Sequence, residues 1–197
     1  MRAADHAHAT LFGLFHHGGL YDRLVSLGFR PLYRRVAADV ASAPLPEGSR
    51  VLDVGTGPGR VPLAIAAARP DLRIEGLDLS PGMIDRARRN AARAGTAGRV
   101  EFTVGDVADL PHPDGSVDLV VSTMSQHHWP DPAAGMRELS RILRPGGQVW
   151  IYDFRVALRR AETAAGPVFP GRLTRREAVR TGRLASGLIG RLVIRPA

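Results

Sequence analysis

The chain of 197 residues is 44% hydrophobic and 23% charged, a balance typical of globular proteins that bury a core. It contains no cysteine, which excludes disulfide bonds, thiolate metal sites and a cysteine nucleophile. No apolar run reaches the length of a membrane span, and the N-terminus lacks the apolar core of a secretory signal. We therefore expect a cytoplasmic protein.

Positive charge is concentrated towards the end of the chain. The net charge is +8, and the segment from Arg155 to Ala197 holds ten arginines against two acids, Glu162 and Glu177. Such a segment could attract nucleic acid, an acidic substrate or anionic lipid. Because the whole chain is rich in Ala, Gly, Pro and Arg and has no lysine, we interpret it instead as a solvated surface.

The first 49 residues carry apolar side chains at helical spacing, among them Leu20, Leu24, Leu27, Leu32, Val36 and Val40. From Arg50 onwards, short apolar runs alternate with helical patterns. The predicted strands are Arg50–Val54, Arg73–Leu79, Val100–Val104, Val117–Ser122 and Gln148–Asp153. The predicted helices are Pro58–Ala68, Pro81–Ala94 and Pro132–Leu143, with a shorter connection at Val107–Leu110.

Strands that alternate with helices predict an α/β fold, with a doubly wound and mostly parallel sheet that is covered on both faces. We expect one domain over residues 1–197, in which residues 1–49 form a helical cover and residues 50–154 the core. The basic C-terminal segment, residues 155–197, is predicted to contain a helix near Ala157–Ala165, a loop through Pro167–Gly171 and a strand near Leu192–Ile194.

The most informative motif lies at the end of the first predicted strand and directly after it. It consists of an aspartate and then three glycines at alternate positions, which are Asp53, Gly55, Gly57 and Gly59. Glycines between a strand and a helix expose backbone amides to a ligand. Two further acids, Asp78 and Asp106, end the next two strands, so all three would lie at the edge where open α/β sheets bind ligands. Alone, each acid could simply cap a turn or a helix.

In this order and spacing, the motifs resemble those of class I S-adenosylmethionine-dependent methyltransferases, in particular the small-molecule group with a UbiE-like core. The resemblance runs from about Arg50 to Asp153. It implies a Rossmann-like sheet with a reversed last strand, S-adenosyl-L-methionine as cofactor and S-adenosyl-L-homocysteine as product. A nicotinamide dehydrogenase fits less well, because its glycines are spaced G-x-G-x-x-G.

The resemblance also implies roles for individual residues. Five of them would line the methionine end of the cofactor: Asp53, Gly55, Thr56, Gly57 and Gly59. Asp78 would accept the ribose hydroxyls, with Leu79 and Met83 against the adenine and Asp106 and Val107 at its edge. Ser122 or Thr123 would face the sulfonium. Tyr21 would contact the cofactor carboxylate, although it could equally be a partly buried aromatic residue on an amphipathic helix.

Two adjacent histidines, His127 and His128, follow the fourth predicted strand, which is where the family places residues near the methyl group. Either could act as a general base, because imidazole titrates near neutral pH. The alternative is that they pack or shape the substrate site. We expect no metal, since the other histidines, such as His16 and His17, lack cysteines or a well-spaced acidic pair beside them.

These observations predict a metal-free methyltransferase that acts on oxygen, nitrogen or carbon of a small-molecule acceptor. The acceptor pocket would be open, or covered by the N-terminal helices or a second subunit, and the protein would be a monomer or homodimer without a membrane span. Two other hypotheses remain: a catalytically silent cofactor-binding or scaffold subunit, and an RNA methyltransferase that uses the basic C-terminal segment.

Overall fold

The computed structural model describes residues 28–180 and 187–196. The chain divides into two compact units, Met1–Leu32 and Tyr33–Ala197, and the description below concerns the second. The predictions for Tyr21 and for the histidines before residue 28 lie outside the described residues. Whether residues 1–197 form one domain, as the sequence predicts, stays a prediction.

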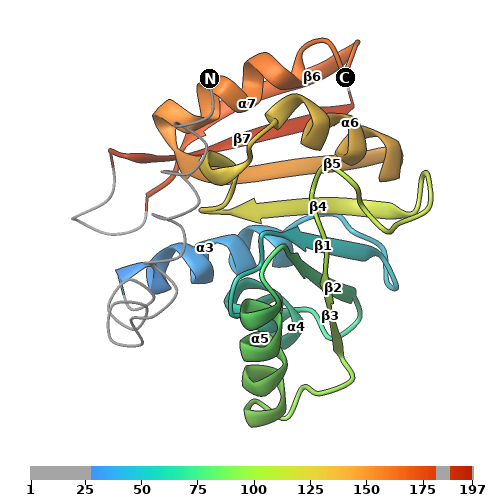
Figure 1. Ribbon diagram of the computed structural model, residues 1–197, viewed down its shortest axis with the longest axis vertical. Coiled ribbons are helices and arrows are strands. Elements are labelled where there is room, and N and C mark those ends of the chain that lie inside the picture. The colour runs from blue at the N-terminus through green and yellow to red at the C-terminus, as the bar shows by residue number, and fades with distance from the viewer. Residues whose placement is uncertain (1–27, 181–186, 197) are drawn as a thin grey trace, which may run out of the picture. The chain divides into compact units, whose positions relative to one another are not determined.

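A seven-stranded sheet forms the centre of the second unit, in the order β3-β2-β1-β4-β5-β7-β6 (Figure 1). The strands are β1 (Arg50–Val54), β2 (Arg73–Asp78), β3 (Val100–Val104), β4 (Val117–Thr123), β5 (Leu143–Phe154), β6 (Arg172–Ala178) and β7 (Ile189–Pro196). Strands β1 to β5 pair in parallel, whereas β7 runs antiparallel to both β5 and β6. The reversed last strand implied by the family resemblance is confirmed.

Most segments that connect the strands form helices, as the alternating pattern predicts; the connection between β3 and β4, which includes Val107–Leu110, forms turns instead. The helices among the described residues are α3 (Arg30–Ala41), α4 (Arg60–Ala68), α5 (Pro81–Arg93), the 3-10 helix η1 (Gln126–His128), α6 (Pro132–Ile142) and α7 (Arg155–Ala165). Ser80 and Asp131 cap α5 and α6 with their side chains, and each is followed by proline in the first turn. A buried apolar cluster joins α6 and α7 to the sheet through Met136, Leu139 and Leu158.

Side chains alternate between the two faces of the sheet along each strand. The residues next to those in the apolar cluster therefore point to the opposite face of the sheet. On β5, Ile151 belongs to the cluster under α6 and α7, whereas the neighbouring Tyr152 reaches Asp39 of α3 on the opposite side. Arg191 of β7 joins this pair: its Nη1 lies 3.1 Å from Asp39 and 3.2 Å from the Tyr152 hydroxyl. The network therefore connects one helix to two strands of the sheet.

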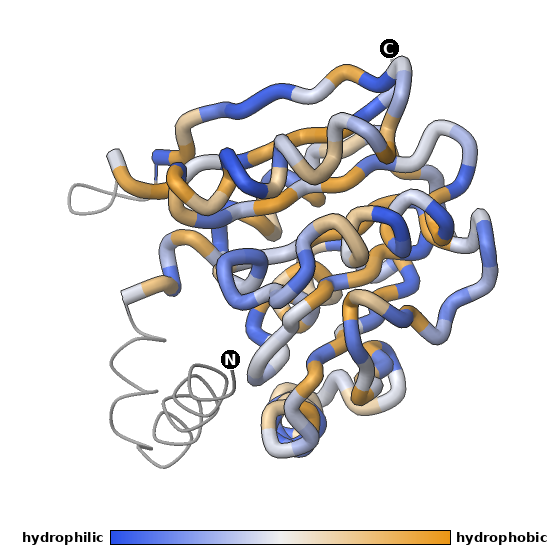
Figure 2. The backbone as a smooth tube through the Cα atoms, turned by 45° about the horizontal axis from the view of Figure 1, so that its top comes forward, coloured by the Kyte–Doolittle hydropathy of each residue, from blue (hydrophilic) through white to orange (hydrophobic). Residues whose placement is uncertain are grey.

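Element boundaries differ from the predictions where a backbone conformation or an exposed surface decides them. Helix α4 begins at Arg60 and not at Pro58, because Gly59 has a φ of +76° and so cannot belong to a right-handed helix. The sequence did not predict strand β6, because most of its side chains are exposed and apolar residues do not alternate with polar ones along it. Figure 2 shows this edge strand as largely hydrophilic, in contrast to the hydrophobic strands in the middle of the sheet.

Candidate active site

The glycine turn after β1 is the structural centre of the site. Gly55, Gly57 and Gly59 all have positive φ angles, of +70°, +53° and +76°. At Gly55 a Cβ atom would lie 1.7 Å from the Ser125 hydroxyl, so only glycine lets the segment after β4 pack on the turn. At Gly57, by contrast, a Cβ atom would meet nothing within 4 Å, which leaves open space beside the backbone.

Asp53 lies at the base of this turn and is 1% exposed. Its Oδ2 accepts a hydrogen bond of 2.7 Å from the Thr56 hydroxyl, whereas Oδ1 is buried with no partner among the described residues. The pKa of Asp53 is raised to about 7, mainly by burial; the hydrogen bond from Thr56 lowers it and the nearby charge of Asp78 raises it. A buried, unpaired carboxylate oxygen is costly, which suits it to bind a cationic or donor group.

Asp78 ends β2 directly beside the turn. Its Oδ2 accepts a 2.7 Å hydrogen bond from the Gly57 amide, and its Oδ1 a 2.9 Å bond from the Ser80 amide. The parallel pairing of β1 with β2 therefore brings Asp78 to Asp53 and the glycines, as predicted. Next to it, Leu79 is 64% exposed, an unusual state for a large apolar side chain, and Met83 is partly buried at the start of α5.

The remaining predicted cofactor residues differ in their surroundings. Asp106 is exposed and its Oδ1 accepts a hydrogen bond from the Ala108 amide, whereas Val107 belongs to the buried core. At the end of β4, the hydroxyls of Ser122 and Thr123 are both buried without a hydrogen-bond partner among the described residues. These two side chains therefore have unused hydrogen-bonding capacity at the sheet edge that carries the turn.

Two residues that the sequence did not single out, Tyr33 and Arg60, lie near the glycine turn and interact electrostatically there. Tyr33 of α3 is largely buried, and this burial raises the pKa of its hydroxyl, while the charge of Arg60 lowers it and that of Asp53 raises it. Tyr33 is thus electrostatically coupled both to the buried carboxylate of Asp53 and to Arg60. The only available signal was that Arg60 follows the last glycine of the motif directly.

A histidine–carboxylate pair forms the second part of the site. The Nδ1 atom of His127 lies 2.8 Å from Asp153 Oδ1, and the His127 amide donates to Oδ2 over 3.1 Å. Asp153 is the penultimate residue of β5 and is fully buried, whereas the His127 side chain is 26% exposed. A carboxylate that accepts from Nδ1 leaves Nε2 as the free basic nitrogen. The sequence showed Asp153 only as a strand end, since 26 residues separate it from His127.

His128 occupies a different environment. Its ring centroid lies 3.9 Å from that of His127. Burial lowers the pKa of His128, the charge of His127 lowers it further, and Asp153 opposes both effects. The structure therefore distinguishes two histidines that the sequence left equivalent, because Asp153 bonds directly to both the ring and the backbone of His127.

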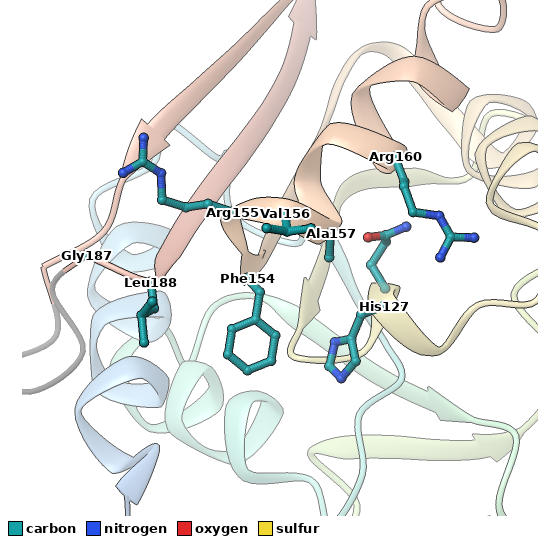
Figure 3. Close-up of a pocket in the computed structure, with 9 residues that line it drawn as sticks. His127, Phe154, Arg155, Val156, Ala157, Arg160, Gly187 and Leu188 are labelled. Atoms are coloured by element: carbon teal, nitrogen blue, oxygen red, sulfur yellow. The ribbon is translucent and has the colours of Figure 1, made fainter.

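An open pocket of about 610 Å³ adjoins His127. It is lined by Gln126, His127, Phe154, Arg155, Val156, Ala157, Arg160, Gly187 and Leu188. Figure 3 shows the rings of His127 and Phe154 pointing in the same direction, and their centroids are 5.5 Å apart. Because Ser125 packs on Gly55, the segment that carries His127 also touches the glycine turn, so the pocket and the turn belong to neighbouring parts of one sheet edge.

Comparison with known proteins identifies the sequence family. A family model described as a methyltransferase domain matches residues 51–147. The chain is 39% identical over 111 residues to 27-O-demethylrifamycin SV methyltransferase of Amycolatopsis mediterranei, covering 56% of this chain and 40% of that protein. It is 36% identical over 135 residues to demethylmenaquinone methyltransferase of Deinococcus radiodurans, covering 68% and 54%. The chain thus spans about half the length of the curated relatives that it matches.

Solved structures support the same fold. A candidate S-adenosyl-L-methionine-dependent methyltransferase from Methanococcus maripaludis matches with a TM-score of 0.75 and 23% identity, over 90% of each chain. The [4+2]-cyclase SpnF matches with a TM-score of 0.67 and 21% identity, over 83% of this chain and 81% of that one. These similarities concern the fold alone, and the second shows that the fold also occurs in a protein described by another reaction.

The residues at the turn fit the cofactor of this family. S-adenosyl-L-methionine carries an ammonium group, which suits the unpaired oxygen of Asp53, and a carboxylate, which suits the exposed amides of the glycine turn. The open space at Gly57 and the exposed Leu79 offer room and an apolar surface for the rest of the molecule. The matched sequence, the sheet order and this fit together show that the chain belongs to the class I S-adenosyl-L-methionine-dependent methyltransferase family.

Proposed function

We propose that the protein is an S-adenosyl-L-methionine-dependent methyltransferase that methylates oxygen, nitrogen or carbon of a small-molecule acceptor without a metal. The observation that carries the proposal is the pairing of His127 with the buried Asp153 beside a pocket and next to the glycine turn. When bound, the cofactor supplies a methyl group that its positive sulfur has already activated. The protein must align the acceptor and, where needed, remove its proton.

His127 is proposed as the general base. The carboxylate of Asp153 accepts the Nδ1 proton, which orients the ring and leaves Nε2 free to take a proton from an acceptor in the pocket. Asp153 would also stabilise the imidazolium that this transfer creates, because the pair lies partly out of water. Asp153 is therefore proposed as a positioning residue that acts through His127.

Residue roles toward the cofactor remain as the sequence predicts them. Asp53 and the amides of the glycine turn would hold the amino-acid end, Asp78 the ribose hydroxyls, and Leu79 with Met83 the adenine face. Asp106 and Val107 would lie at the adenine edge, and Ser122 or Thr123 near sulfur. The contacts of Asp78 support its role, because the same carboxylate already orders the Gly57 amide.

The named activities of the relatives support a small-molecule acceptor, since both 27-O-demethylrifamycin SV and demethylmenaquinone are small molecules.

The basic C-terminal segment gives little support to an RNA substrate, because several of its arginines form contacts that stabilise the fold. Arg176 lies 2.8 Å from Glu162, Arg191 lies 3.1 Å from Asp39, and Arg172 donates to the Gly147 carbonyl. Among the described residues no helix is long and apolar enough to cross a membrane. We propose a cytoplasmic monomer or homodimer.

The test is transfer of a labelled methyl group from S-adenosyl-L-methionine to a pool of small-molecule acceptors, with the wild type and three variants. We expect His127→Ala to lower the rate by about 100-fold or more, the usual contribution of a positioned base. Asp153→Asn should lower it as well, and His128→Ala should cost less than His127→Ala. Calorimetry with S-adenosyl-L-homocysteine should show nearly unchanged cofactor affinity in all three.

Two outcomes would contradict the proposal. Absence of any labelled product, despite tight binding of S-adenosyl-L-homocysteine, would favour the catalytically silent binding subunit. Turnover of His127→Ala at the wild-type rate would leave the methyltransferase activity intact but remove the role of His127 as base.

A further inference from the structure

The pocket beside His127 has an exposed apolar wall. Phe154, Val156 and Leu188 are 39%, 78% and 65% exposed, and all three line the same pocket. Single exposed apolar side chains are normal on a protein surface, but three around one concavity are typical of a site that binds an apolar group. The wall therefore predicts that the acceptor has an apolar body.

The charged residues of the pocket are of one sign. Its lining includes Arg155 and Arg160 and no carboxylate. Figure 3 shows Arg160 extending from α7 on the side of His127, whereas Arg155 extends away from it. The guanidinium of Arg160 makes no ion pair or hydrogen bond with the residues that the structure describes, in contrast to Arg176 and Arg191 of the same segment. An uncompensated guanidinium at a pocket attracts an anion.

The start of α7 adds to this positive field. The helix runs from Arg155 to Ala165, and its N-cap residue, Phe154, forms no capping hydrogen bond with its side chain. Val156 and Ala157, in the first turn, line the pocket. The first amides of a helix have no acceptor within the helix and carry a partial positive charge. The Arg155 amide donates to the Leu188 carbonyl, so the amides of Val156 and Ala157 are the ones that favour an anion in the pocket.

Gln126 is an independent sign that a polar group binds here. It lines the pocket, is 1% exposed, and its Oε1 has no hydrogen-bond partner among the described residues. A buried amide that lacks a partner is costly, and the ligand is the natural source of the missing hydrogen bond. A protonated or hydroxyl-bearing end of the acceptor would satisfy its oxygen, and a rotated amide would donate to an anionic one.

We propose that the acceptor is an apolar molecule with one anionic group, such as a carboxylate, and that Arg160 and the first turn of α7 bind that group. Phe154, Val156 and Leu188 would contact its apolar body. The proposal rests on the proposed function, since it describes the acceptor that His127 would deprotonate. Asp153 does not line the pocket, and its carboxylate accepts hydrogen bonds from His127 and the Phe154 amide, so it does not contact the anion.

Two fluorescent probes of similar shape and different charge test this proposal. The first is 1-anilinonaphthalene-8-sulfonate, an apolar anion, and the second is the uncharged N-phenyl-1-naphthylamine. We expect the sulfonate to bind the folded wild type at a single saturable site and more tightly than the neutral probe. Raising the sodium chloride concentration should weaken the binding of the sulfonate and leave the binding of the neutral probe unchanged, because salt screens the charge at an open pocket.

Variants then locate the charge. Arg160→Gln should weaken sulfonate binding by about 5-fold or more, while it leaves the neutral probe unaffected. Arg159→Gln is the matched control, because Arg159 is an exposed arginine on the same helix that does not line the pocket, and it should change neither affinity. Phe154→Ala should weaken both probes through loss of the apolar wall. Circular dichroism confirms that each variant is folded.

Several results would overturn the proposal: no saturable sulfonate binding, equal affinity for both probes, or equal losses in Arg160→Gln and Arg159→Gln. Titration with S-adenosyl-L-homocysteine separates this outcome from failure of the proposed function. If the wild type does not bind that product, the methyltransferase proposal fails whatever the probes show. If the wild type binds the product but Arg160→Gln leaves the affinity for the sulfonate unchanged, only the proposal of an anionic acceptor is excluded.

Discussion

At the level of single residues, the acidic groups of the site are distinguished by their environments. Asp53 is buried with one unpaired oxygen, Asp78 is partly exposed and bonded to two amides, and Asp106 is exposed in a turn. The sequence predicted all three at one edge of the sheet but could not rank them, because burial depends on neighbours that are distant along the chain. The pairing of Asp53 with Thr56 is local and lies within the recognised motif.

Asp78→Ala should weaken binding of S-adenosyl-L-homocysteine by about 1–3 kcal/mol, because buried cofactor hydroxyls would lose a charged acceptor. Isothermal titration calorimetry measures the change. Asp85→Ala serves as the control, since Asp85 is an exposed acid on α5 whose ion pair with Arg88 is long, at 4.0 Å. If Asp78→Ala binds as tightly as the control, the ribose assignment is wrong.

Asp53 should make the stability of the cofactor-free protein depend on pH. Its pKa is about 7 in the folded protein and near 3.8 when unfolded, so the folded state binds more protons between these values and stability falls as pH rises. Between pH 6 and 8 the wild type should lose about 1 kcal/mol more unfolding free energy than Asp53→Asn. Urea unfolding at the two pH values measures this difference, and parallel curves for the two proteins would refute it.

At the level of elements, local sequence patterns placed the strands and helices of the core well. Strands β1 and β3 have the predicted bounds, and β2 ends at Asp78, one residue early. The pattern succeeds at β1 because this central parallel strand is buried on both faces and reads as an apolar run, and at the edge strand β3 because apolar and polar side chains alternate along it. The patterns failed at β6, whose exposed side chains give no such run and whose place depends on pairing with β7.

The glycine turn allows backbone strain and ligand binding to be tested separately. Gly57 and Gly115 have similar φ angles, +53° and +58°, and a Cβ at either would meet nothing within 4 Å. Alanine at each position should therefore cost about 1 kcal/mol of stability from the left-handed conformation. Only Gly57→Ala should also weaken the binding of S-adenosyl-L-homocysteine, because its Cβ would occupy the open space. The expected loss is about 10-fold or more, which corresponds to about 1.4 kcal/mol. Equal affinities by calorimetry would place the cofactor elsewhere.

At the level of the whole molecule, a polar network connects segments that are far apart in the sequence. Asp39, Tyr152 and Arg191 come from α3, β5 and β7, and Arg191 also pairs with Glu177 of β6. Burial raises the pKa of the Tyr152 hydroxyl, which keeps it protonated as a donor to Asp39. The network holds the C-terminal strands to the core, and so supports β5, from which Asp153 reaches His127.

Removing members of this network should cost unequal amounts of stability. Tyr152→Phe should lower the unfolding free energy by about 1 kcal/mol, because Asp39 keeps its contact with Arg191. Arg191→Leu should cost about 2 kcal/mol or more, because Asp39 loses its contact with β7 and Glu177 keeps a 3.5 Å contact with the exposed Arg175, although Arg35 and Tyr152 still pair with Asp39. Urea unfolding followed by circular dichroism measures both, and equal losses would show that the arginine does not hold the network together.

The sequence by itself determined the family, the order of strands and helices from β1 to β5, and the glycine turn with its three acids, because each is a local pattern imposed by burial or by backbone conformation. Only the tertiary structure decided that His127 pairs with Asp153, that Gln126 is buried without a partner among the described residues, and that Arg160 lines a pocket with Leu188. These relations join residues from different elements. They arise when the sheet brings the ends of β4, β5 and β7 together, which no local spacing along the chain can express.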